Sequence, residues 1–171
     1  VIGDGPDRER IEERVDQAEA RDAVRFHGWV AHAAVQEILV ACDALALPSI
    51  REFGGGVVLE AMALGVVPIV VDYGGPGELV TAETGHRVAI GPRDGIVGGF
   101  RATLADLGRD PASLRAMGER AKQRILSHFT WDAKARQTLE VYRWVLGERA
   151  TRPAFAELLD RRGDDTPSRV P

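Results

Sequence analysis

Apolar residues follow two spacings along the chain, and the two spacings alternate. Short continuous apolar runs are typical of strands buried on both faces, and stretches with an apolar residue at every third or fourth position are typical of amphipathic helices. We expect strands at residues 1–2, 24–27, 43–48, 66–71 and 87–90, and helices around residues 11–18, 35–42, 57–64, 97–107, 114–125 and 131–146. Such alternation implies right-handed crossovers and a mostly parallel sheet. The pattern therefore predicts an α/β domain with helices on both faces of its sheet.

The composition is that of one soluble globular domain. Of the 171 residues, 44% are hydrophobic and 28% charged, which excludes fibrous and disordered classes. We place the domain at residues 1–148 and expect a frayed helix and a disordered tail at 149–171. The net charge of -4 argues against a nucleic-acid partner. One cysteine suits a reducing, cytoplasmic location, and no apolar run approaches the roughly 20 residues of a transmembrane helix.

Glycine is over-represented, and its excess falls in clusters that follow predicted strands. The chain has 19 glycines, and four clusters account for much of the excess. They are Gly3-Asp4-Gly5, Gly28-Trp29, residues 49–56 and residues 74–77. In an open parallel sheet, ligands bind beyond the carboxyl ends of the strands, so the four loops together predict one binding edge. Any one cluster is also explained by the tight turns that join strands to helices.

The cluster after the third predicted strand is the most specific candidate. Three consecutive glycines, 54–56, open a predicted helix, where bare backbone N–H groups and the helix dipole favour a phosphate. Glu52 precedes these glycines and Glu60 lies about one turn inside the helix. Carboxylates accept paired hydrogen bonds from vicinal hydroxyls, so the two could hold a sugar and a ribose. The alternative is a favourable charge at the helix start and an exposed helix residue.

Other chemistries lack their residue patterns. There is no Asp-x-Asp, and the four histidines show no metal-ligand spacing, so we expect no metal site. Ser49 lacks the Gly-x-Ser-x-Gly elbow of a nucleophile. Cys42 falls on the apolar stripe of its predicted helix, and we interpret it as structural.

Nine short motifs occur in a fixed order along residues 1–146. They are Val-Ile-Gly-Asp-Gly-Pro at 1–6, Val-Arg-Phe-His-Gly at 24–28, Leu-Pro-Ser at 47–49, Glu52 with Glu60, Glu-Ala-Met-Ala-Leu-Gly at 60–65, Pro-Ile-Val-Val at 68–71, Gly-Gly at 74–75, Gly-Glu-Leu-Val at 77–80 and Phe-Thr-Trp at 129–131. This ordered set resembles GT4-type retaining glycosyltransferases of the GT-B fold. The resemblance implies a Rossmann-like sheet that forms the C-terminal, donor-binding half of a GT-B fold, closed by C-terminal helices.

The resemblance also implies roles for the matching residues. Glu52 would contact hydroxyls of the donor sugar as the candidate catalytic residue, orienting the sugar rather than attacking it. Glu60 would accept hydrogen bonds from the ribose diol. The further donor-binding candidates are Gly3, Gly5, Gly28, Trp29, Val30, Ser49, Phe53, Gly54, Gly55, Gly56 and Val57. Of these, residues 28–30 would contact the base. The family retains the anomeric configuration without a metal, so we expect no cofactor.

The implied partners are a nucleotide-diphosphate sugar, with UDP or GDP as the nucleotide, and an N-terminal acceptor domain. The chain opens on a strand end, and we expect it to lack that domain and the basic residues that clamp the diphosphate. The full-length parent would be a glycosyltransferase of the hexosyltransferase type, and peripheral membrane association through the parent is compatible with this view. We expect the isolated fragment to be inactive.

Two other classes of function stay open at this point. A GT-B-fold sugar-nucleotide epimerase would need acid and base residues near the sugar. A related phosphorylase would need a pyridoxal-phosphate lysine, but Lys122 and Lys134 both lie in the late helices. A non-catalytic α/β nucleotide-binding or scaffolding domain would have kept the fold and lost the chemistry, and the pair Glu52 and Glu60 argues against it.

Overall fold

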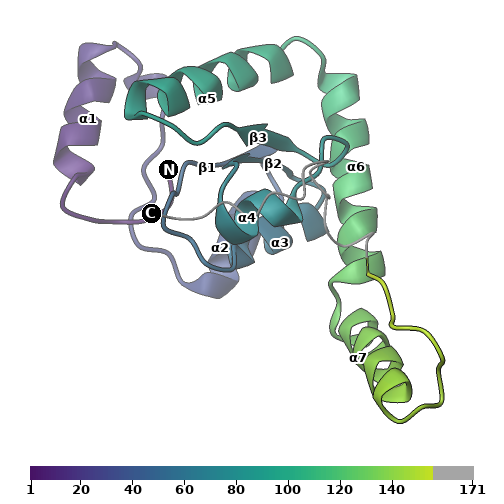
Figure 1. Cartoon of the computed structure of the whole chain (residues 1–171). Coiled ribbons are helices and arrows are strands. Elements are labelled where there is room, and N and C mark those ends of the chain that lie inside the picture. Colours follow the sequence, from purple (N-terminus) through teal and green to yellow (C-terminus); the bar gives the residue numbers. More distant parts are fainter. Residues whose placement is uncertain (156–171) are drawn as a thin grey trace. The chain divides into compact units, whose positions relative to one another are not determined.

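The structure is a computed structural model, and it describes residues 1–155. The chain divides into two compact units, Val1–Ala41 and Cys42–Pro171, and each is described here by itself. Figure 1 shows the ribbon coloured along the sequence, with the first unit in purple. The prediction that residues 1–148 form one domain stays a prediction.

The first unit contains two α-helices, one short 3-10 helix and a pair of extended segments. Helix α1 spans Arg8–Gln17, the short 3-10 helix η1 spans Arg21–Ala23, and α2 spans His32–Leu39. The segments expected as strands at 1–2 and 24–27 are not regular strands. They do pair, because the Val1 ammonium donates to the Arg25 carbonyl (2.7 Å) and the His27 N–H donates to the Val1 carbonyl (2.9 Å). Two such short segments form too few bonds for a regular ladder.

Helix α2 is shorter than its apolar spacing predicts. It ends at Leu39, so Cys42 lies beyond it and is exposed. The interpretation of Cys42 as a residue on an apolar helix stripe is therefore wrong. The spacing of three and four residues continues past the last helical turn, and spacing alone does not show where the backbone leaves the helix.

The second unit is built on a three-stranded parallel sheet. The strands are β1 (Ala44–Leu47), β2 (Val67–Val71) and β3 (His86–Val88), in the spatial order β1-β2-β3. Ala46 pairs with Ile69, and Val70 pairs with Arg87. All three strands were expected, although β3 begins one residue earlier and ends two residues sooner than the apolar pattern predicted. A parallel order without gaps places the three following loops at one edge of the sheet.

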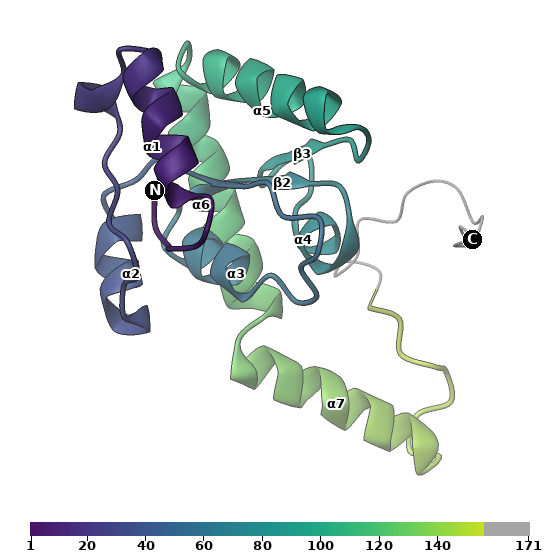
Figure 2. The same ribbon diagram turned by 90° about the vertical axis from the view of Figure 1, so that its left-hand side faces the viewer.

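Five helices accompany this sheet within the described residues. They are α3 (Gly56–Ala63), α4 (Gly74–Leu79), α5 (Arg93–Leu107), α6 (Pro111–His128) and α7 (Trp131–Val145). In both views of the ribbon, α5 lies on one side of the sheet and α3 and α4 lie on the other (Figures 1 and 2). No helix in the described part is long and apolar enough to cross a membrane. Residues 149–155 contain no helix, and the rest of the predicted tail lies outside the described residues.

The side chains of β2 divide the core into two clusters. Val70 packs with Met62 of α3 and Ile125 of α6 on one face of the sheet. Its neighbours Ile69 and Val71 point the other way and join the cluster that contains α5. This alternation is what a strand buried on both faces requires, because successive side chains point to opposite faces. The prediction of an α/β fold with helices on both faces of a parallel sheet is confirmed.

Candidate functional site

The loops that follow β1 and β2 meet at the carboxyl edge of the sheet. Residues 48–55 connect β1 to α3, and residues 72–73 connect β2 to α4. The first two residues of α4 are Gly74 and Gly75, and neither position has room for a side chain. A Cβ atom on Gly75 would overlap the Phe53 carbonyl. A Cβ on Gly74 would lie 3.0 Å from the Glu52 carbonyl oxygen, and Gly74 also has a φ of +56°. The two loops therefore touch backbone to backbone, which only glycine permits.

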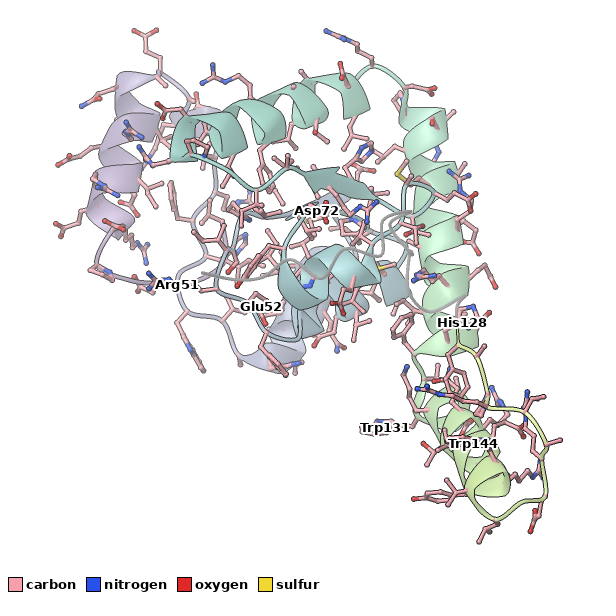
Figure 3. All side chains as sticks on the ribbon, viewed as in Figure 1. Arg51, Glu52, Asp72, His128, Trp131 and Trp144 are labelled. Carbon is pink, nitrogen blue, oxygen red and sulfur yellow. The ribbon has the colours of Figure 1, made fainter. Side chains whose placement is uncertain are left out.

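Glu52 folds back over its own loop. Its Oε1 accepts hydrogen bonds from the backbone N–H of Gly55 (3.0 Å) and of Gly54 (3.3 Å), and the residue is half-buried. A carboxylate that accepts from two backbone donors both fixes the loop and is itself fixed. Because an ionised carboxylate has about four acceptor sites, it can still accept from a ligand. Figure 3 labels Glu52 next to Arg51 on this loop.

The start of α3 presents free backbone amides at the same place. Gly55 is the N-cap in the left-handed conformation, and its carbonyl accepts from Val58 (2.8 Å) and Leu59 (3.3 Å). Within residues 1–155 no side chain caps this helix, so the amides of Gly56 and Val57 have no capping acceptor. A Cβ on Gly54 or Gly56 would meet no described atom within 4 Å. These amides can therefore donate to an anion that approaches the helix start.

The remaining predicted residues of this loop differ in exposure. Phe53 is 98% exposed, whereas Val57 and Glu60 are half-buried. Ser49 is half-buried, and its Oγ accepts from the Arg51 N–H at 3.4 Å, which ties the residue into the turn after β1. The structure thus brings Ser49 and the residues from 52 to 57 together on one loop and one helix turn.

The predicted residues of the first unit form a group of their own. The Gly3 N–H donates to the Gly28 carbonyl (2.8 Å), so the two glycine loops of this unit lie side by side. Trp29 is 79% exposed, Val30 is half-buried, and Gly5 donates from its N–H to the Asp4 carboxylate (2.9 Å). The four loops expected at one edge are therefore seen as two pairs, one pair in each unit.

Sequence reasoning overlooked Arg8, which stands beside the glycine pair of the first unit. A Cβ on Gly28 would lie 3.0 Å from the Arg8 guanidinium. Arg8 also bonds Glu12 (2.8 Å) and contacts Asp4 (3.4 Å). The hydrogen bond to Glu12, together with the charge of Asp4, raises the pKa of Arg8. Its spacing of four residues from both carboxylates was the available signal. In the part of the chain that is described, no cluster of side chains could hold a metal ion.

The family of this chain follows from a comparison with known protein families. The model of the family described as glycosyl transferases group 1 matches residues 1–124. The chain belongs to that family. Among curated relatives of this glycosyl transferase group 1 chain, the glycogen synthase of Mycobacterium tuberculosis (strain ATCC 25618 / H37Rv) is 33% identical over 83% of the chain. The 2-deoxystreptamine N-acetyl-D-glucosaminyltransferase of Streptomyces fradiae is 34% identical over 86% of the chain. In both comparisons the chain spans 34% of the relative's length.

Solved structures give the same fold. The sucrose-phosphate synthase of Thermosynechococcus elongatus matches with a TM-score of 0.67 and 29% identity, over 86% of this chain and 38% of that one. The Anabaena protein HepE, solved in complex with UDP, matches with a TM-score of 0.69 and 20% identity, over 86% of this chain and 40% of that one. The resemblance to GT4-type glycosyltransferases and the Rossmann-like half of a GT-B fold are thereby confirmed.

Proposed function

We propose that this chain is the donor-binding part of a glycosyltransferase and binds a nucleotide-diphosphate sugar at the loop between β1 and α3. The observation that carries the proposal is the Glu52 carboxylate, held by two backbone amides beside the uncapped start of α3. A sugar diphosphate needs two features next to each other: an acceptor of hydrogen bonds for its sugar hydroxyls and amide donors for its diphosphate.

Each residue of the loop has a role in this proposal. Glu52 accepts from hydroxyls of the donor sugar. The amides of Gly56 and Val57, which have no capping acceptor within residues 1–155, donate to the diphosphate. Those of Gly54 and Gly55 hold Glu52 and so shape the site. Glu60 lies one turn further along α3 and accepts from the ribose diol. Ser49 and Phe53 flank the donor. Because residues 54 and 56 have open space where a side chain would stand, a phosphate can approach the backbone closely.

The first unit supplies the base-contacting residues in this proposal. Gly3, Gly5 and Gly28 shape the two neighbouring loops, and the exposed ring of Trp29, next to Val30, offers a face for stacking. The family resemblance supports this role, and the hydrogen bond between Gly3 and Gly28 shows that the two loops lie close together within the unit.

The proposed reaction keeps the anomeric configuration and uses no metal, as the family resemblance implies. The acceptor hydroxyl oxygen bonds to the anomeric carbon on the face from which the phosphate oxygen departs. The proton of that hydroxyl passes to the leaving phosphate, so charge and atoms balance. Donors at the start of α3 stabilise the negative charge that builds up on the phosphate. Glu52 orients the sugar, since its carboxylate is already engaged by two amides of its own loop.

The relatives support a sugar donor and a longer parent protein. One curated relative is named a glycogen synthase and the other an N-acetyl-D-glucosaminyltransferase, and HepE is also known in complex with UDP-glucose. Because the chain spans about a third of those relatives, we propose that the parent supplies an acceptor domain. We further propose that the parent is of the hexosyltransferase type and cytoplasmic, and that this chain alone does not turn over substrate.

Calorimetric titration of the chain with UDP, GDP and their glucose conjugates tests the proposal. We expect binding in the millimolar range or tighter, and Glu60→Ala should weaken nucleotide and nucleotide sugar equally by about fivefold, the loss of one hydrogen-bond acceptor. Glu52→Ala should weaken only the sugar conjugate. Absence of binding by all four ligands would refute the donor site. Unchanged affinity in Glu60→Ala would remove the ribose assignment alone.

A further inference from the structure

A cavity of about 430 Å³ lies beside the loop that carries Glu52. Gly54 of that loop and Gly75 at the start of α4 form one wall, and Phe129, between α6 and α7, forms another. Phe155, which follows α7 in the chain, returns to close a third side. The volume falls in the range of small-ligand pockets, roughly 300–1,000 Å³. The cavity therefore adjoins the proposed transfer site through Gly54.

The wall at Phe129 is held in place by two cations. The guanidinium of Arg124 lies 5.5 Å from the centre of the Phe129 ring, and the ammonium of Lys134 lies 4.6 Å from it. Arg124 also donates from Nε to the Leu79 carbonyl (3.1 Å), which ties α6 to the end of α4. Both cation–π distances are within the attractive range of about 6 Å. The aromatic wall is thus preformed rather than assembled by a ligand.

Two charged side chains of opposite sign line the same cavity. Lys134 donates from Nζ to the Gln137 amide oxygen (3.2 Å), and Glu78 is an exposed residue of α4. Among residues 1–155, neither Lys134 nor Glu78 forms an ion pair. The ammonium can therefore donate to a ligand oxygen, and the carboxylate can accept from a ligand hydroxyl. A purely apolar occupant would desolvate both charges without replacing their hydrogen bonds.

We propose that this cavity binds a pyranose ring. A pyranose has an apolar C–H face, which packs on an aromatic wall, and a rim of hydroxyls, which matches a donor such as Lys134 and an acceptor such as Glu78. Both Phe129 and Phe155 line the cavity, but the Phe129 ring is covered by Arg124 and Lys134, so Phe155 offers the aromatic face for the sugar ring. Gly54 places that ring next to the loop of Glu52. The ring belongs to either the donor sugar or the sugar acceptor, and the choice of ligand class rests on the proposed function.

The experiment titrates the isotope-labelled chain with methyl α-glucopyranoside, methyl α-mannopyranoside or N-acetylglucosamine. Binding is monitored by the backbone amide chemical shifts in NMR spectra. Sorbitol, which has the hydroxyls without the ring face, is the matched control ligand. We expect a pyranoside to shift the amides of Gly54, Gly75 and Lys134 saturably, and sorbitol to leave them unchanged. Phe155→Ala should weaken binding about tenfold, and Glu78→Gln about fivefold. Trp144→Ala is the matched control variant, because that ring does not line this cavity.

The source of the ring is decided with UDP and UDP-glucose. If the cavity holds the donor sugar, Phe155→Ala removes the gain in affinity of UDP-glucose over UDP. If it holds an acceptor sugar, that gain is kept while pyranoside binding is lost. No shifts with any of the three sugars, equal shifts with sorbitol, or equal loss in Trp144→Ala would overturn the proposal. Pyranoside binding without any nucleotide binding would refute the donor function and leave this site standing.

Discussion

The two glycine clusters at the carboxyl edge of the sheet look alike in the sequence and differ in the structure. Residues 54–56 and residues 74–75 both lie in the connection from a strand of the sheet to the helix after it, and both are at the start of that helix. In the first cluster, a Cβ on Gly54 or Gly56 would meet no described atom. In the second, a Cβ on Gly75 would overlap the carbonyl of Phe53, the residue directly before the first cluster. The first cluster leaves Gly54 and Gly56 accessible, although Gly55 between them is buried, with its Cβ position 3.1 Å from the Pro76 ring. The second cluster uses its missing side chains to support the loop that carries the first.

This difference separates two reasons for glycine in a strand-to-helix loop. A ligand site needs bare amides that face solvent, as at the start of α3. Close packing of two backbones needs the absence of Cβ, as at Gly74 and Gly75. The site therefore depends on glycines that no ligand has to touch. Substitutions in the two clusters should have different consequences.

The largest effect is expected for Gly75→Ala. The added methyl group must displace the Phe53 carbonyl and with it the loop held by Glu52, at a cost of about 1–3 kcal/mol of unfolding free energy. Urea unfolding measures that loss. The affinity for a UDP sugar should fall by about tenfold in the same variant, since loop and carboxylate move together. If Gly75→Ala kept both the free energy of unfolding and the affinity for a UDP sugar, the distinction between an accessible and a packing glycine cluster would be refuted.

A smaller loss of stability is expected for Gly118→Ala, which tests close packing away from the edge. A Cβ on Gly118, in α6, would overlap the Gly65 carbonyl just after α3. Overpacking costs about 1–3 kcal/mol, and the better helix propensity of alanine returns up to about 1 kcal/mol. Urea unfolding should therefore show a net loss of up to about 2 kcal/mol. Calorimetry should show unchanged donor affinity, in contrast to Gly75→Ala.

Mild acid should lower the free energy of unfolding through protonation of His86, a residue outside both glycine clusters. Its Nε2 is buried with no hydrogen-bond partner among the described residues, and burial lowers the pKa of His86, against a weaker raising effect of Asp106. The unfolded chain takes up a proton near pH 6.5 that the folded chain resists, so the free energy of unfolding falls as pH drops below about 6.5. Urea unfolding at several pH values should show this slope, and His86→Phe should reduce it. A slope that persists unchanged in the variant would assign it to other groups.

The smallest effect on stability is expected for Gly54→Ala. The new methyl group has open space, so the free energy of unfolding should change by no more than about 0.5 kcal/mol in urea unfolding. Calorimetry should nevertheless show weaker donor binding, because the methyl group stands where a ligand approaches the amides. Loss of stability comparable to Gly75→Ala would show that the first cluster is also a packing cluster.

Much of the fold was predictable because its signals are local. The apolar run of β2 and the glycine that ends α3, Gly65 with a φ of +81°, follow from residue types that lie next to each other. The segments at 1–2 and 24–27 were overestimated as strands, because an apolar run does not show whether a neighbour extends the ladder. The end of α2 before Cys42 was missed for a similar reason.

The candidate site was predictable in its residue types and not in its contacts. The spacing of Glu52 and Glu60 around three glycines indicated a phosphate and hydroxyl site. It did not show that Glu52 accepts from the amides of its own loop. Lys134 and Phe155 gave no signal at all, since each lies about 80–100 residues from the loop in the sequence and reaches the cavity only through the packing of α6 and the return of the chain after α7.

The sequence by itself determined the alternation of strands and helices, the parallel sheet, and which residue types stand after each strand. These depend on backbone preferences and on the burial of successive side chains, which act over a few residues. The tertiary structure decided which glycines stay open, which ones pack, and which distant side chains line the cavity beside them. Such choices depend on contacts between backbone and side chains from separate elements, and those contacts exist only once the sheet has brought its loops to one edge.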